Sequence, residues 1–79
     1  MTIHSAKIQP AVIVTDCNGD HVITNDSGED ATLIFIDLVP EANWAHDCLY
    51  LLVQSSGYVK KAYHQWPPSD RLSEELVTV

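Results

Sequence analysis

The sequence predicts a small α+β domain, in which a small antiparallel sheet (an N-terminal hairpin plus further strands) packs on one main helix. Three observations predict this fold. Asn18-Gly19 lies between two β-branched segments, residues 33–36 form an unbroken apolar run, and residues 41–55 carry apolar side chains at helical spacing. One helix laid on a sheet lets a short chain cover its apolar residues with few elements. At 79 residues, the chain is expected to form a single domain over 1–79.

The first predicted element is a β-hairpin over residues 11–24. Its strands, 11–15 and 21–24, are rich in β-branched residues, and Asn18-Gly19 suits the two positive-φ positions of a type I′ turn. Both faces of this hairpin are half apolar, so either face could meet the core. The expected cross-strand pairs are Cys17 with Asp20, Asp16 with His21, Thr15 with Val22 and Val14 with Ile23.

Residues 31–39 are predicted to form the next strand. The run Leu33-Ile34-Phe35-Ile36 barely alternates between apolar and polar side chains. This pattern is typical of a central strand that is covered on both faces.

Residues 41–55 are predicted to form the main helix. Pro40 and Glu41 favour a helix start, Trp44 heads an apolar row at i, i+4 and i+8, and Gly57 favours a helix end. We expect Trp44 to be buried in the core. The alternative is a strand over 48–54 followed by a turn over 55–57; the segment length, the proline and the glycine favour the helix.

The C-terminal third is less regular. Residues 58–65 are predicted to form a strand, although Lys60-Lys61-Ala62 leaves a helix open as the alternative. Ser69 is expected to cap a short helix that carries Leu72 and Leu76, and the last three residues are expected to be extended or frayed.

The charge distribution narrows the partner class. The net charge is −7, and residues 1–59 hold eight acids against Lys7 alone. This field repels phosphates and anionic lipid heads, so we expect a protein partner with a basic surface, no direct nucleic acid and no membrane. The chain lacks an apolar secretory segment and has two cysteines, which predicts a cytoplasmic protein with free thiols. The patterns allow a monomer or a homodimer equally.

Two groups of residues are the candidate partner-binding surface. The first is a block of five acids within fifteen residues, with no lysine or arginine among them, and the second is an aromatic rim near the C-terminus, because tyrosine and tryptophan are enriched at interfaces. These residues are Asp16, Asp20, Asp26, Glu29 and Asp30, and Tyr58, Tyr63 and Trp66.

No catalytic, metal or cofactor site is predicted. Cys17-x3-His21 and His46-x-Cys48 do not converge in the predicted elements, and the acids around Gly19 lack the spacing of a calcium-binding loop. The sequence therefore favours a small acidic non-enzymatic protein that acts by protein–protein binding, of the inhibitor, immunity or regulator type, including phage-encoded blockers of nucleic-acid-binding complexes such as CRISPR effectors. The alternatives are a metal-binding or small regulatory domain, and third a small enzyme or enzyme subunit.

Overall fold

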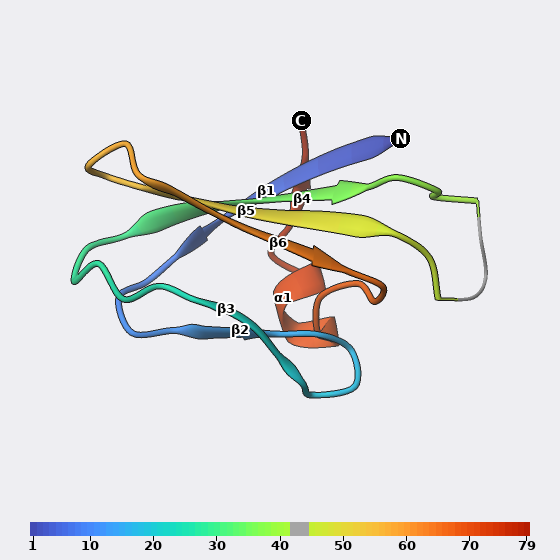
Figure 1. Ribbon diagram of the computed structural model, residues 1–79, viewed down its shortest axis with the longest axis horizontal. Coiled ribbons are helices and arrows are strands. Elements are labelled where there is room, and N and C mark those ends of the chain that lie inside the picture. The colour runs from blue at the N-terminus through green and yellow to red at the C-terminus, as the bar shows by residue number, and fades with distance from the viewer. Residues whose placement is uncertain (42–44) are drawn as a thin grey trace.

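The computed structural model describes residues 1–41 and 45–79, and these residues are mostly antiparallel β-structure (Figure 1). Five strands form one sheet in the order β6-β5-β4-β1-β7, and β2 and β3 form a separate hairpin. The elements are β1 (Thr2–Ile8), β2 (Ile13–Thr15), β3 (His21–Thr24), β4 (Ala31–Asp37), β5 (Cys48–Gln54), β6 (Val59–His64), α1 (Asp70–Ser73) and β7 (Val77–Thr78).

The prediction of an α+β fold with one main helix is wrong. Residues 48–54 form strand β5, which pairs with β4 on one side and with β6 on the other, and the four-residue α1 is the only helix in the described part of the chain. Along β5, alternate residues point inward, but the outward residues are apolar too. A segment that is apolar on both faces satisfies helical and strand spacing alike, so its pattern does not decide between them. Residues 42–44, and with them the predicted burial of Trp44, lie outside the described residues.

Several other predictions are confirmed. The strand predicted over 31–39 is β4, which is central in the sheet, and the strand predicted over 58–65 is β6. Ser69 caps α1, because its side chain accepts a hydrogen bond from the backbone N–H of Leu72. Strand β1 was not predicted, although it pairs along its whole length with β4, from Thr2 opposite Asp37 to Ile8 opposite Ala31.

The hairpin is present, but its turn differs from the predicted type I′ turn. Gly19 has a φ of +85° and Asn18 does not have a positive φ, so a single left-handed residue ends a three-residue loop. The loop is closed by hydrogen bonds between Asp16 and Asp20 and from the Gly19 N–H to the Asp16 carbonyl. Val14 pairs with Ile23 as predicted, but Thr15 pairs with His21 because a bulge removes Val22 from the ladder.

The same loop geometry recurs between β5 and β6. There the Gly57 N–H donates to the Gln54 carbonyl, the Gln54 N–H donates to Tyr58, and Gly57 has a φ of +92°. Gly57 therefore serves a hairpin turn and not the end of a helix.

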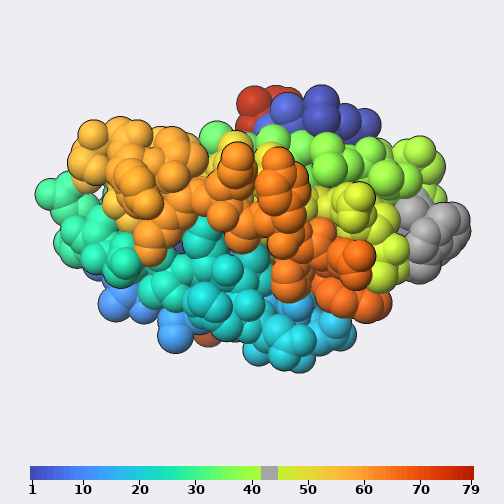
Figure 2. All heavy atoms as spheres, in the orientation of Figure 1, coloured from blue at the N-terminus to red at the C-terminus, as the bar shows by residue number. Residues whose placement is uncertain are grey.

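The hairpin and α1 lie on the same face of the five-stranded sheet (Figure 1). Val14 and Ile23 of the hairpin pack with Leu33, Phe35 and other inward residues of the sheet, and Leu72 of α1 packs against this core. Figure 2 shows that side chains fill the space between the hairpin and β6. The other face of the sheet has no described helix or strand over it, since the remaining elements all belong to the sheet itself.

Gly19→Ala should lower the free energy of unfolding by about 1–2 kcal/mol, because an alanine at positive φ is strained. An added Cβ at Gly19 would meet no atom within 4 Å, so the cost comes from the backbone alone. The matched variant Asn18→Ala should cost less than about 0.5 kcal/mol, as exposed substitutions usually do. Urea unfolding of both variants measures these changes. Equal losses of unfolding free energy in the two variants would instead support the type I′ turn, in which both residues have a positive φ.

Candidate functional site

Asp16 is the first of the predicted partner-binding residues, and its side chain is buried, with 1% exposed. One carboxylate oxygen accepts hydrogen bonds from the backbone N–H groups of Asn18 (2.8 Å) and Asp20 (3.0 Å). The other accepts one from Nε2 of His64 on β6 (2.7 Å). Asp16 therefore closes the hairpin turn and joins it to the edge of the sheet, and its carboxylate is not part of the surface.

The expected pairing of Asp16 with His21 is replaced by this bond to His64, while His21 bonds to Thr24 (2.7 Å). The hydrogen bond from His64, followed by those from the backbone of Asp20 and Asn18, lowers the pKa of Asp16 from its usual value of 3.8, although burial acts in the opposite direction. The ionised carboxylate is thus the form that the folded protein holds.

Tyr50 and Cys48 extend this buried polar cluster along β5. The Tyr50 hydroxyl donates to the Trp66 carbonyl (2.8 Å), and the Tyr50 ring lies edge-on to those of Phe35 and His64. The Cys48 thiol donates to the carbonyls of His64 and Trp66, both at 3.3 Å. Burial raises the pKa of Cys48 to about 11, which disfavours the reactive thiolate. These contacts fasten the segment after β6 to the sheet.

The other acids of the block lie on the surface but not together. Asp20 is at the tip of the hairpin, whereas Asp26, Glu29 and Asp30 follow β3 and lie at the opposite end. We call these three residues the acidic corner. Figures 1 and 2 show the loop that holds them beside the turn between β5 and β6.

Side-chain bonds hold the acidic corner in one geometry. Asp26 pairs with Lys60 (2.8 Å) and accepts from Gln54 (3.2 Å), and Glu29 accepts from the Ser55 hydroxyl. Asp30 lies 3.6 Å from the ammonium group of Lys7. Lys60, through its hydrogen bond and charge, lowers the pKa of Asp26. The corner is preorganised, and part of its charge is already neutralised.

Asn25 anchors the loop that precedes the corner. It is fully buried, and its amide nitrogen donates to three carbonyls, those of Ile8 (3.0 Å), Gln9 (3.1 Å) and Glu29 (2.7 Å). Its amide oxygen accepts from the Ser27 hydroxyl (2.7 Å). The sequence analysis did not single out this residue.

The predicted aromatic rim is also divided between two ends of β6. Tyr58 precedes the strand, is 61% exposed and ends the turn beside the acidic corner. Tyr63 and Trp66 lie at the far end of β6, with exposed fractions of 71% and 39%. Of the predicted residues, the structure therefore brings Tyr58 next to the acidic corner and leaves Asp20, Tyr63 and Trp66 elsewhere.

The outer face of the sheet is a candidate surface that the sequence analysis missed. Its members point away from the hairpin and α1 and are half-buried or exposed. The signal was present, since neither 33–36 nor 48–53 alternates with polar residues. We call this surface the open face; its apolar residues are Ile3, Ile34, Ile36, Leu49, Leu51, Val53, Val59, Tyr63 and Val77.

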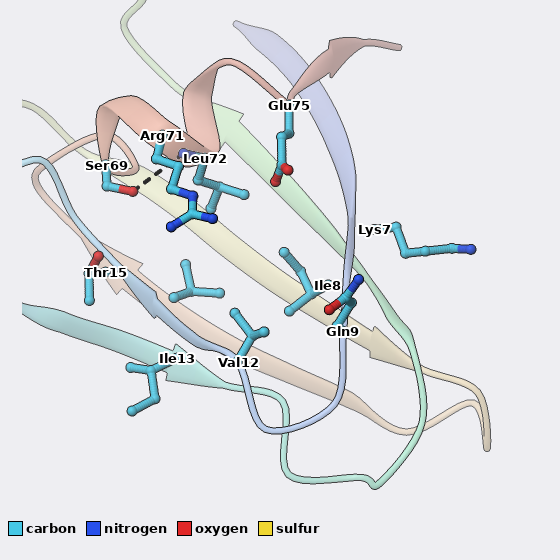
Figure 3. A pocket seen from close by; sticks show the side chains of 11 residues that line it. Lys7, Ile8, Gln9, Val12, Ile13, Thr15, Ser69, Arg71, Leu72 and Glu75 are labelled. Carbon is cyan, nitrogen blue, oxygen red and sulfur yellow. Dashed lines mark hydrogen bonds between the residues drawn. The ribbon is translucent and has the colours of Figure 1, made fainter.

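A groove of about 440 Å³ lies on the other side of the molecule, between the hairpin, β1 and α1 (Figure 3). Val12 and Ile13 form one wall, and Arg71 reaches into it from α1. The described residues that line it include neither a cysteine nor a histidine.

Comparison with protein-family models, curated proteins and solved structures finds no match to this chain. Over residues 1–41 and 45–79, no three His, Cys, Asp or Glu side chains are grouped so that they could hold a metal ion. No helix in the described ranges has the length and hydrophobicity needed to cross a bilayer.

Asp16→Asn should lower the urea midpoint at pH 7, because it removes the charge that accepts three hydrogen bonds. A carboxylate whose pKa is lowered on folding stabilises the fold above its unfolded-state pKa, and this contribution is lost as pH falls through the folded-state pKa. The difference in urea midpoint between the variant and the wild type should therefore decrease below pH 3.8. Asp20→Asn, at an exposed position, is the control; a midpoint for Asp16→Asn equal to that of the control at pH 7 would contradict the role of Asp16.

Alkylation should distinguish the two cysteines, which are both free. Cys17 is exposed and Cys48 is buried with a raised pKa, so iodoacetamide at pH 8 should modify Cys17 at least about 100-fold faster. Mass spectrometry of digested protein gives both rates, and the difference should vanish in urea. Equal alkylation rates of the two cysteines in the folded protein would show that Cys48 is accessible to the reagent, which would contradict its burial.

Proposed function

We propose that this chain is a small non-enzymatic protein that acts by binding other proteins. The open face carries the proposal. Apolar patches of more than a few hundred Å² are rare on isolated soluble domains and mark interaction surfaces. Strands β4 and β5 are apolar on both faces, yet the described helix and hairpin cover only one of those faces.

We further propose that the partner has a basic surface and that the acidic corner and Tyr58 bind to it. The net charge of −7 supports it, and so does the preorganised geometry of the corner, since groups that are already held in place lose little entropy on binding. The carboxylates of Asp26 and Asp30 remain 64% and 51% exposed. Complementary charge mainly raises the rate of association.

A small acidic protein that binds a basic surface can act as an inhibitor, an immunity protein or a regulator. When the basic surface is one that otherwise holds nucleic acid, the acidic protein competes with that nucleic acid. Phage-encoded blockers of nucleases and of CRISPR effectors are of this type, and size and charge are what support the analogy.

The test is a charge reversal at the corner. Glu29→Lys with Asp30→Lys avoids Asp26, which is tied to Lys60 and Gln54. A partner captured from an extract of the organism that encodes the protein should then associate at least about 10-fold more slowly, and the loss should shrink at high salt, because the screening length falls to ~8 Å at 0.15 M. Biolayer interferometry measures both rates.

The matched control is Asp47→Lys with Glu74→Lys, which changes the net charge equally at two exposed positions away from the corner. Its association rate should stay within about 2-fold of the wild type, apart from a general effect of net charge. If both double variants behave alike, the acidic corner has no specific role. If no protein is captured at all, the proposed binding function itself fails.

A further inference from the structure

The open face is arranged in three cross-strand rows. The first row is wholly apolar and runs Ile3, Ile36, Leu49, Tyr63. The second runs Val77, Ser5, Ile34, Leu51, Lys61, and the third Lys7, Thr32, Val53, Val59. Aliphatic side chains therefore fill the centre of the face, and the polar ones lie toward its borders.

The charge on this face differs from that of the chain as a whole. Lys7 on β1 and Lys61 on β6 are its charged side chains, and none of the acids lies in the three rows. Each lysine already has a neighbour: Lys7 lies 3.6 Å from Asp30, and the Lys61 ammonium lies 5.7 Å from the centre of the Tyr63 ring. The three rows themselves contain no carboxylate, despite the net charge of −7, and Asp30 lies at their border beside Lys7.

The size of the face suits a protein interface. With strands about 4.8 Å apart and a rise of about 3.3 Å per residue, three strands of seven residues, one of six and one of two give a projected area of roughly 450 Å². Side-chain relief increases the accessible area beyond this projection. Specific interfaces bury about 600–1,000 Å² per partner, and this face corresponds to the lower end of that range.

We propose that two copies of the chain pack their open faces together into a symmetric sandwich. The inference rests on the proposed binding function and names the occupant of the open face. Sheets pack face to face at about 10 Å with their inner side chains interdigitated, and a two-fold axis lets one apolar face cover its own copy. The lysines lie on β1 and β6, so the outward residues of the two strands between them, β4 and β5, carry no charge.

The test is sedimentation velocity over a range of about 1–200 μM. The wild type should sediment as a dimer, with twice the 8.8 kDa mass of the chain. Leu51→Glu should weaken dimerisation at least about 100-fold, because it places a charged carboxylate in an otherwise apolar interface. Within one copy the new carboxylate lies opposite Lys61, so the variant should still fold.

The matched control is Ile13→Glu. Ile13 is an equally apolar residue that is 57% exposed on the hairpin, away from the open face, and this variant should remain dimeric. Circular dichroism and urea unfolding of both variants confirm that each is folded.

Three outcomes would overturn the proposal. A wild type that is monomeric throughout the range shows that no second copy occupies the face. A dimer that survives Leu51→Glu shows pairing elsewhere, such as along the edge of β6 or β7. A dimer that Ile13→Glu also dissociates shows an interface on the hairpin side. If the wild type is monomeric but still captures another protein, the sandwich proposal is wrong and the proposed binding function stands. If Leu51→Glu then abolishes that capture, the open face binds the other protein.

Discussion

The described part of this 79-residue chain builds a five-stranded sheet and a cover for only one of its faces. This constraint determines the rest of the structure. The hairpin β2–β3 and α1 are the elements left over once the sheet is made, and both lie on the same side. The apolar residues on the other side of β4 and β5 consequently have nothing from the described chain above them. An uncovered apolar face of this kind is the observation that supports the proposed association with another molecule.

The cover is too small to hold itself in place by apolar contacts alone. Val14 and Ile23 supply most of its fully buried apolar surface. Polar bonds fix its two ends: Asp16 and His64 at the tip, and Asn25 with Lys60 and Asp26 at the base. Buried polar groups of this kind are costly unless fully satisfied, and the carboxylate of Asp16 accepts three bonds. The most buried member of the acidic block is thus a structural residue.

The elements that were predicted correctly are those determined by short stretches of sequence. The hairpin, β4, β6 and the Ser69 cap all follow from turn residues, β-branched runs and capping chemistry in short segments. The prediction of a main helix was wrong because residues 48–54 are apolar on both faces, so the spacing of apolar residues does not distinguish a helix from a strand. The segment is a strand because it pairs with β4 and β6, and such pairing between segments is not visible in the local pattern. The acidic block was predicted from closeness in sequence, but its members do not lie together in space. Strand β3 separates Asp20 from Asp26, and Asp16 is buried.

The acidic corner meets the open face only at its border, where Asp30 lies 3.6 Å from Lys7. Two copies joined through their open faces would each keep an acidic corner at the end of the sheet, held by the same bonds to Lys60 and Ser55. A partner with repeated basic surfaces would then meet two corners on one rigid assembly. Binding at the second corner becomes intramolecular and gains from a high effective concentration when the spacing fits. The two proposals are therefore compatible in one small sheet: the open face would join two copies, and the acidic corner would present charge to another protein.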